Sequence, residues 1–351
     1  MRRDLILGPP GTGKTFTLMR EIESLRADGF MLHEIGFVSF TRRAIREASE
    51  RAMADFGLDE KPPWFRTLHS TFWQLGGFGR GNQRITHTEL REFNTEFGYQ
   101  ISEDDDHAVL EEGVATVKNK LRDDPLKAAH EWARARRAPL EQAAGVVGVP
   151  LPQLRAYARA WTDWKRRNVK ADHTDCLERA VEQRTIIPVR ALIVDEAQDL
   201  NPLQIQSLAP TLACAEVVLV AGDDDQAIFT YSGAEPEWIM GLASSPAWRT
   251  RVLSQSYRVP RAVHAVAESA VRTNTRRVEK MYAPVARDGE VVRGVTSAAR
   301  ELAARIVDGP HRSGAVLCRT RKATGRHVDD LFRRQELPYI VAKGIGPNPL
   351  G

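Results

Sequence analysis

The sequence has little cysteine, no long hydrophobic run and little net charge. Its three cysteines, Cys176, Cys214 and Cys318, are too few and too scattered for a disulfide framework or a zinc site. No apolar stretch approaches the roughly 20 residues that a membrane helix requires, and the amino terminus lacks the apolar core of a secretion signal. We therefore expect a cytoplasmic α/β protein with no membrane partner.

The charge balance does not exclude any class of binding partner. The chain has 50 Lys and Arg residues against 46 Asp and Glu residues, which leaves a net charge of +4. So small a surplus neither requires nor excludes a polyanionic partner, because local patches of charge decide binding. Hydrophobic residues make up 42% of the chain and charged residues 27%, as is usual for globular proteins. At roughly 150 residues per domain, the length of 351 residues predicts two or three domains.

Short apolar runs alternate with amphipathic segments along much of the chain. Buried strands are predicted at residues 5–7, 35–39, 191–194, 217–221, 315–318 and 338–341. Leu18, Met19, Ile22 and Leu25 recur at helical spacing after the first of these runs, and Gly29 is a plausible end for that helix. Strands that alternate with helices predict an α/β fold with a parallel, doubly wound sheet.

One long stretch departs from this alternation. Between residues 76 and 164 the strand signals fade, and helical segments rich in Ala, Arg, Glu and Leu dominate. We interpret this stretch as a helical insertion in a first α/β domain formed by residues 1–75 and 165–259. A second, partial α/β domain is expected over residues 260–351.

The first predicted strand runs into a glycine-rich loop, Gly8-Pro9-Pro10-Gly11-Thr12-Gly13-Lys14-Thr15. Glycines let backbone N–H groups approach phosphates, and the N-terminus of the following helix adds partial positive charge. Lys14 is expected to reach the β- and γ-phosphates of ATP, and the Thr15 hydroxyl to bind Mg²⁺. The loop predicts nucleotide binding, but it occurs in both AAA+ ATPases and helicases.

A later predicted strand, residues 191–194, ends in two carboxylates, Asp195 and Glu196. A carboxylate at the tip of a strand opposite the loop can hold Mg²⁺, so Asp195 is the second candidate ligand. The adjacent Glu196 can orient and deprotonate the attacking water. ATP and Mg²⁺ are therefore the cofactors that we expect.

Several further motifs follow one another in a definite order. Residues 195–199 read Asp-Glu-Ala-Gln-Asp, and residues 222–226 read Gly-Asp-Asp-Asp-Gln. The other motifs are Val-Ser-Phe-Thr at 38–41, Thr-Leu-His-Ser at 67–70, Asp-His-Thr-Asp at 172–175 and Leu-Ser-Gln-Ser-Tyr-Arg at 253–258. Together they resemble the superfamily 1 DNA helicases of the UvrD/Rep/PcrA type. The Asp-Asp-Asp-Gln segment at 223–226 and the Gln-Ser-Tyr-Arg segment at 255–258 disfavour an AAA+ protein.

The resemblance implies a RecA-like P-loop NTPase fold and a superfamily 1A motor. Such a motor hydrolyses ATP, is stimulated by single-stranded DNA and moves in the 3′-to-5′ sense. By the same resemblance, Gln226 senses the γ-phosphate, Arg258 is an arginine finger, and Tyr257 stacks near the adenine. Phe16 stands where the family often has an arginine that packs on the base.

The resemblance also implies a groove for DNA. The expected DNA contacts are Phe40, Thr41, Arg42, His69, Phe229 and Tyr231. Aromatic faces stack on any base with roughly 1–3 kcal/mol each, so single-stranded DNA or a DNA junction is the expected partner. Other basic residues extend the path or simply face solvent: Arg43, Arg134, Arg136, Arg137 and residues 165–167.

Two departures from the family bear on function. The family's glutamine-bearing adenine motif precedes the loop that here starts at residue 8, and its last two motifs would follow residue 351. We therefore expect the N-terminal portion of a helicase motor, which a second polypeptide completes. The alternatives are a stand-alone ATP-gated DNA-binding protein or ATPase without unwinding activity, and an inactive regulatory module. The intact Lys14, Asp195 and Glu196 disfavour the last.

Overall fold

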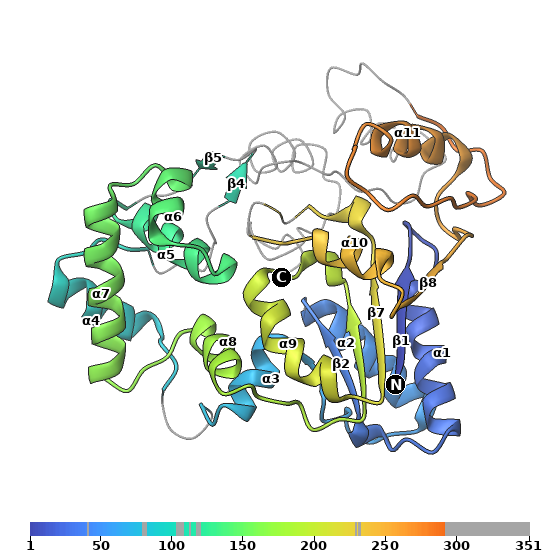
Figure 1. The fold of residues 1–351 in the computed structure, drawn as a ribbon, viewed down its shortest axis with the longest axis horizontal. Helices are drawn as coiled ribbons and strands as arrows, with labels where there is room; N and C mark the ends of the chain where they lie inside the picture. Colours follow the sequence, from blue (N-terminus) through green and yellow to red (C-terminus); the bar gives the residue numbers. More distant parts are fainter. Residues whose placement is uncertain are drawn as a thin grey trace, which may run out of the picture. The chain divides into compact units, whose positions relative to one another are not determined.

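A six-stranded parallel sheet organises the described part of the chain (Figure 1). The computed structural model describes residues 1–40, 42–78, 83–102, 109–111, 114–116, 121–228, 230 and 233–291. The chain divides into two units, Met1–Asp288 and Gly289–Gly351, and all that follows concerns the first. The predicted domain boundaries stay a prediction.

The sheet confirms the predicted α/β class. Its strand order is β3 (Phe65–Thr67), β2 (Ile35–Ser39), β6 (Ala191–Asp195), β7 (Val217–Gly222), β1 (Arg2–Leu7) and β8 (Arg249–Val252). Every pairing in it is parallel. The strands predicted near the beginning and middle of the chain are therefore confirmed as β1, β2, β6 and β7, whereas β3 and β8 were not predicted. The strands predicted at 315–318 and 338–341 lie outside the described residues.

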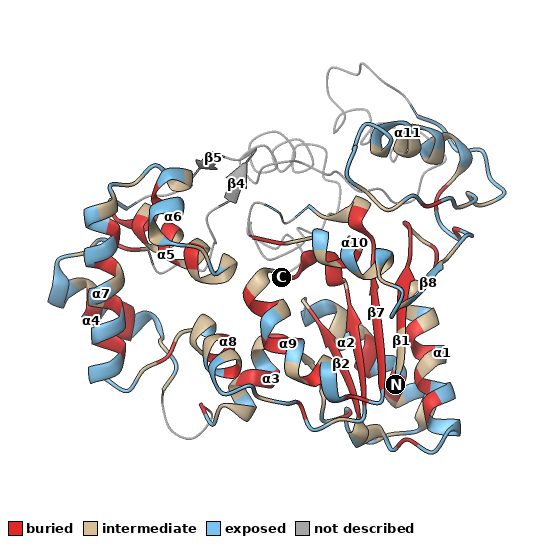
Figure 2. Cartoon of the chain, viewed as in Figure 1, coloured by how far each residue is buried: buried red, intermediate tan, exposed pale blue. Residues whose placement is uncertain are grey.

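Both faces of the sheet are covered, which explains the continuous apolar runs of its inner strands. β2, β6 and β7 are buried along their whole length, as Figure 2 shows. Alternate side chains enter two different cores, because successive residues of a strand point to opposite faces. In β6, for example, Leu192 and Val194 join one core, while Ala191 and Ile193 join the other.

Helices from different parts of the chain complete the two cores. The core on one face receives α1 (Lys14–Ala27) and α2 (Arg42–Phe56). The core on the other face receives α3 (Leu68–Leu75), α8 (His173–Glu182), α9 (Pro202–Cys214) and α10 (Glu237–Ser244). The helix predicted after the glycine-rich loop is confirmed as α1, whose buried residues are Leu18, Met19, Ile22 and Leu25.

The stretch predicted to be helical has a third core of its own. It contains α4 (His87–Phe97), α5 (Asp124–Arg136), α6 (Leu140–Val147) and α7 (Leu151–Arg167). Phe93 lies in this core with its ring 4.7 Å from that of Trp161, in an edge-to-face arrangement. A short antiparallel pair, β4 (Val109–Glu111) and β5 (Val114–Thr116), is also present.

After β8 the chain continues through an irregular segment into α11 (Arg261–Val271). We call residues 253–288 the 253–288 segment. This segment contacts the glycine-rich loop that follows β1 and the residues that follow β7. None of the described helices combines the length and the apolar composition that crossing a membrane requires.

Candidate nucleotide site and nucleic-acid interface

Three motifs from distant parts of the sequence meet at the carboxyl ends of three neighbouring strands of the sheet. The glycine-rich loop follows β1, residues 223–226 follow β7, and Asp195 ends β6. These strands are neighbours in the order β6-β7-β1. Because ligands of open α/β sheets bind at the carboxyl ends of the strands, this edge is the expected nucleotide site.

The glycine-rich loop forms a cradle in which two of the glycines, Gly8 and Gly11, have no room for a side chain. A Cβ atom on Gly8 would lie 2.0 Å from Cγ of Lys14, and one on Gly11, whose φ is +73°, would lie 2.7 Å from Cβ of Arg258. Gly13 precedes α1 in a left-handed conformation, and no described side chain caps the helix there. The first N–H groups of α1 are thus available to an anion.

The two carboxylates at the end of β6 lie in different environments. Asp195 is only 2% exposed, and its burial, followed by the charge of Glu196, raises the pKa of its carboxyl group to about 7. Glu196 has a left-handed backbone (φ 52°), a conformation that costs free energy outside glycine and is concentrated at functional sites. Its Oε2 lies 3.4 Å from Nζ of Lys14. The candidate base therefore faces the candidate phosphate-binding lysine.

The residues present fit an ATP·Mg²⁺ complex. Mg²⁺ is usually held by one or two protein oxygens together with phosphates and water, because it gives up its waters reluctantly. Asp195 and the Thr15 hydroxyl are the oxygens in question. Within the described ranges, no group of three or more His, Cys, Asp or Glu residues is placed to hold a metal ion. The phosphates and water would therefore supply most of the ligands.

Gln198 joins two of the motifs, although the sequence analysis assigned it no role. Its Nε2 donates to Oε2 of Glu196 at 2.8 Å, and its Oε1 accepts from the backbone N–H of Asp223 at 3.0 Å. A backbone N–H can only donate, so the amide oxygen must face Asp223 and the amide nitrogen must face Glu196. The sequence offered one sign that Gln198 has a role in the site, namely its place within the Asp-Glu-Ala-Gln-Asp motif.

Gln226 reaches the cradle from the end of β7. Its Nε2 donates to Oδ2 of Asp223 at 2.6 Å and lies 3.5 Å from the carbonyl oxygen of Gly8. The structure therefore brings the predicted phosphate sensor next to the loop predicted to hold the phosphates.

The 253–288 segment lies against the same loop. The N–H of Tyr257 donates to the Gly11 carbonyl at 2.9 Å, and the Ser256 hydroxyl donates to the Pro10 carbonyl at 2.9 Å. The side chains of Tyr257 and Arg258 are exposed, the former by 74%. Both residues thus lie beside the cradle, with side chains available to a nucleotide.

The other predicted nucleotide contacts lie within the loop or directly after it. The Thr12 hydroxyl donates to the Pro9 carbonyl at 2.7 Å and so stabilises the turn. Phe16, on the first turn of α1, is exposed, and the guanidinium carbon of Arg20 lies 5.4 Å from the centre of its ring.

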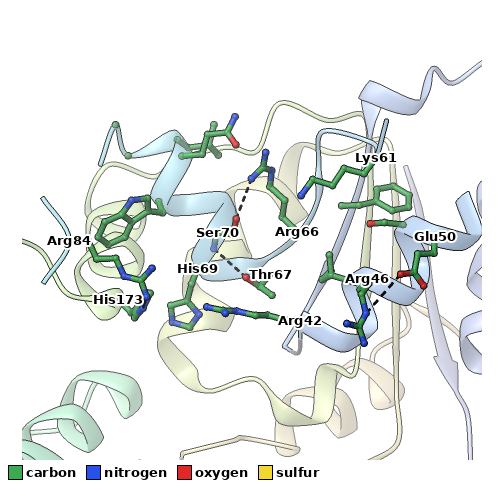
Figure 3. A pocket seen from close by; sticks show the side chains of 18 of the residues that line it. Arg42, Arg46, Glu50, Lys61, Arg66, Thr67, His69, Ser70, Arg84 and His173 are labelled. Atoms are coloured by element: carbon green, nitrogen blue, oxygen red, sulfur yellow. Dashed lines mark hydrogen bonds and ion pairs between the residues drawn. The ribbon is translucent and has the colours of Figure 1, made fainter. Parts of the chain in front are cut away.

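A second candidate site, the α2/α3 pocket, has a volume of about 1280 Å³ (Figure 3). It is lined by residues of α2, β3 and α3, by Arg84 and by His173 of α8. Its basic lining residues are Arg42, Arg46, Lys61, Arg66 and Arg84. Glu50 is the one carboxylate among the lining residues. This excess of guanidinium and ammonium groups suits a phosphate backbone.

The α2/α3 pocket brings together two of the predicted DNA contacts. Figure 3 shows Arg42, from α2, extending toward the ring of His69, from α3. Phe40, at the end of β2, is half-buried. Thr41, Phe229 and Tyr231 lie outside the described residues.

Local hydrogen bonds order the side of this pocket that α3 forms. Thr67 precedes α3, and its hydroxyl accepts from the N–H of Ser70 at 3.4 Å, as an N-cap does. Arg66 donates to the Ser70 hydroxyl at 3.3 Å, and Arg84 lies 2.9 Å from Nε2 of His173. The Thr-Leu-His-Ser motif therefore begins a helix whose first turn faces the pocket.

Comparison with known families decides the assignment. The family described as the UvrD/REP helicase N-terminal domain matches residues 2–246. This chain belongs to that family. The match covers every strand of the sheet except β8, together with the glycine-rich loop, both acidic motifs and the α2/α3 pocket.

Individual relatives of this UvrD/REP-family chain are similar at a lower level. ATP-dependent DNA helicase Rep of Escherichia coli is 26% identical over 295 residues, which cover 79% of this chain and 42% of Rep. ATP-dependent DNA helicase UvrD1 of Mycobacterium tuberculosis is 25% identical over 390 residues, covering 97% of this chain and 48% of UvrD1. The chain thus spans about half the length of the curated relatives that it matches.

In this UvrD/REP-family chain, two basic residues considered for the DNA path lie instead in a buried network. Arg134 of α5 pairs with Asp172 at 2.7 Å and with Asp175 at 2.6 Å. Lys165 of α7 pairs with the same two carboxylates, at 2.7 and 2.6 Å. Burial acts to raise the pKa of the Asp172 carboxyl group, but the charges of Arg134 and Lys165 outweigh it and hold this pKa well below its usual value. The Asp-His-Thr-Asp motif thus anchors α5 and α7 to α8.

Proposed function

We propose that this chain is the nucleotide-binding portion of an ATP-dependent DNA helicase motor. Its ATP hydrolysis is stimulated by single-stranded DNA and drives movement in the 3′-to-5′ sense. The observation that carries the proposal is the meeting of Lys14, Glu196 and Gln226 at one edge of the sheet. Lys14 Nζ lies 3.4 Å from Glu196, and Gln226 Nε2 lies 3.5 Å from the Gly8 carbonyl.

The residues at this edge divide the work of hydrolysis. Lys14 and the first N–H groups of α1 bind the phosphates. Thr15 and Asp195 would hold Mg²⁺, which would neutralise charge on the phosphate oxygens. Glu196 orients the attacking water and accepts its proton. Gln198 and Lys14 fix the direction of the Glu196 carboxylate. Arg258, beside Gly11, adds a guanidinium that suits the transferred phosphoryl group.

We further propose that the α2/α3 pocket binds the DNA backbone. Arg42, Arg46 and Arg66 supply charge for phosphates, and His69 supplies an aromatic face for a base. The relatives Rep and UvrD1 are named ATP-dependent DNA helicases, which supports DNA as the partner. Single-stranded DNA or a DNA junction is the substrate that we propose.

The nucleotide assignment is tested by measuring ATP hydrolysis with Mg²⁺, with and without single-stranded DNA. We expect Lys14→Ala and Glu196→Gln each to lower turnover at least about 100-fold, because each removes a group that acts on the reacting phosphate or water. The control is Lys127→Ala, on α5, a helix that belongs to the third core and not to the cores that flank the sheet. Unchanged turnover in Lys14→Ala would contradict the assignment.

The DNA assignment is tested by the salt dependence of binding to a single-stranded oligonucleotide. The double variant Arg42→Ala with Arg46→Ala is expected to bind more weakly and to reduce the slope of log K against log salt by about 1.4, at roughly 0.7 per lost phosphate contact. Arg51→Ala is a matched control, because Arg51 lies on the same helix but does not line the pocket. Equal effects of the double variant and the control would contradict the assignment.

The requirement for a second polypeptide stays a prediction. It is tested by measuring unwinding of a 3′-tailed duplex by this chain with and without the protein encoded next to it. Unwinding that appears only with the added protein would support a shared motor. ATP turnover without unwinding in either mixture would favour the ATP-gated DNA-binding protein.

A further inference from the structure

A buried lysine contacts all three aspartates of the Gly-Asp-Asp-Asp-Gln motif. Nζ of Lys280 lies 3.1 Å from Oδ1 of Asp223, 2.5 Å from Oδ1 of Asp224 and 2.9 Å from Oδ2 of Asp225. The Lys280 side chain is only 2% exposed. One ammonium group thus satisfies three carboxylates that lie more than fifty residues away in the sequence.

The aspartates depend on this segment for their charge balance. The side chains of Asp223 and Asp224 are 1% and 2% exposed, so water cannot replace the lysine. Arg277 adds a bidentate pair to Asp225, at 2.8 and 2.7 Å, and the N–H of Val278 donates to Asp224 at 2.8 Å. Removal of one partner from a buried ion pair leaves an uncompensated charge, which is strongly destabilising. Residues 277–280 therefore stabilise the conformation of residues 223–226.

Asp223 links this cluster to the nucleotide cradle. Its Oδ1 faces Lys280, while its Oδ2 accepts from Nε2 of Gln226 at 2.6 Å. The same Nε2 lies 3.5 Å from the carbonyl oxygen of Gly8. One carboxylate thus divides its two oxygens between the lysine and the candidate sensor, and its direction sets where the Gln226 amide lies.

We propose that Lys280 is a positioning residue for recognition of the γ-phosphate. It holds Asp223 so that the Gln226 amide faces the cradle, and discrimination between nucleoside triphosphate and diphosphate depends on it. This inference rests on the proposed function, because it assumes that Gln226 contacts the phosphate of a bound nucleotide. It assigns to the 253–288 segment the task of assembling the sensor of the first motor domain.

The test compares the affinity of the whole chain for a non-hydrolysable ATP analogue with its affinity for ADP, both with Mg²⁺. In Lys280→Met the preference for the triphosphate is expected to fall about tenfold or more, because a hydrogen bond to a charged phosphate is misplaced. Lys170→Met is the matched control. Lys170 also forms a close ion pair, at 2.6 Å with Glu89 of α4, a helix that belongs to the third core and not to the cores that flank the sheet.

A double-mutant cycle separates positioning from general stability. Gln226→Ala is expected to lose the same preference, and Lys280→Met in that background to lose nothing more, since the lysine acts through the glutamine. A purely structural role predicts instead equal weakening of triphosphate and diphosphate binding. Where Lys280→Met does not fold, Lys280→Met combined with Asp224→Asn removes a carboxylate together with the cation, and the same loss of preference is expected.

The outcomes distinguish this inference from the proposed function. A wild-type chain that binds neither nucleotide would overturn the proposed function and, with it, the role of Lys280. Wild-type discrimination that is retained in Lys280→Met, or additive losses in the double-mutant cycle, would overturn the role of Lys280 alone.

Discussion

The side-chain oxygen of Gln198 accepts a hydrogen bond from the backbone N–H of Asp223 at 3.0 Å. The two residues lie at the ends of neighbouring strands, β6 and β7, and the other end of the same amide donates to Glu196 at 2.8 Å. A fixed amide between the two acidic motifs therefore sets the direction of the candidate base.

Gln198→Ala is expected to lower kcat for ATP hydrolysis about 10- to 100-fold and to change KM little. The Glu196 carboxylate would lose its donor, while the phosphate-binding groups would stay in place. Steady-state kinetics with saturating Mg²⁺ measure both constants. Gln142→Ala, at an exposed position on α6, serves as the control. A rise in KM with unchanged kcat would contradict the positioning role.

Gly11→Ala is expected to abolish nucleotide binding. The residue has a φ of +73°, and an added Cβ would lie 2.7 Å from Cβ of Arg258 and 2.8 Å from the Ser256 hydroxyl oxygen. Either the loop or the 253–288 segment would have to move. The control is Gly145→Ala on α6, where a Cβ meets nothing within 4 Å and where alanine favours the helix by about 1 kcal/mol. Titration with a fluorescent ATP analogue would show the difference, and equal affinities in the two variants would exclude the steric argument.

Arg134→Met is expected to lower the free energy of unfolding by about 3 kcal/mol, because the half-buried Asp172 and Asp175 lose one of the two cations that balance them and Glu178 loses its pairing with Arg134. The guanidinium contacts Asp172, Asp175 and Glu178, each at 2.6 or 2.7 Å. Arg166→Met is the control, since Arg166 lies on the surface and pairs with Asp163. Urea unfolding followed by tryptophan fluorescence measures both, and similar values for the two variants would mean that the network adds no stability.

The contribution of His130 to the unfolding free energy is expected to fall as the pH drops from about 6.5 toward 3. Burial, together with the charge of Arg134, lowers the pKa of His130 from 6.5 to about 3 in the folded chain. At this residue the folded state then binds fewer protons than the unfolded state, so the contribution is fully present above 6.5 and is lost below it, on the order of a few kcal/mol in total.

Replacing the histidine isolates this contribution. The unfolding free energy of the wild type minus that of His130→Gln should fall as the pH drops below about 6.5. The same difference for His87→Gln, at an exposed position on α4, should not change with pH. A difference for His130→Gln that does not change with pH would contradict the assignment.

The inner strands and the edge strands of the sheet differ in how well the sequence predicts them. β2, β6 and β7 are buried on both faces, so each is a continuous apolar run. β8 reads Arg-Thr-Arg-Val and has no buried residue, and β3 has only three residues. Edge strands pair on one side only, and charged residues are usual there, so neither the length nor the composition marked these two.

In the candidate site, too, some features were predictable from the sequence and others were not. The glycine-rich loop was predictable because eight consecutive residues carry the whole cradle. The contacts of Gln198 with Asp223, and of Lys280 with three aspartates, were not, because they join residues far apart in the sequence. The basic residues show the same limit, since composition alone does not separate Arg42, which lines the α2/α3 pocket, from Arg134, which is buried in an ion-pair network.

The chemistry was readable from the residues alone: a phosphate cradle, two carboxylates after a buried strand, and the ordered motifs of a helicase family. Which of these groups lie together followed from the fold. The order β6-β7-β1 brings Glu196, Gln226 and Lys14 to one edge, and the 253–288 segment places Lys280 among the aspartates. The physical reason is that parallel strands are joined by crossovers, so the partner of each strand depends on packing and not on its local residues.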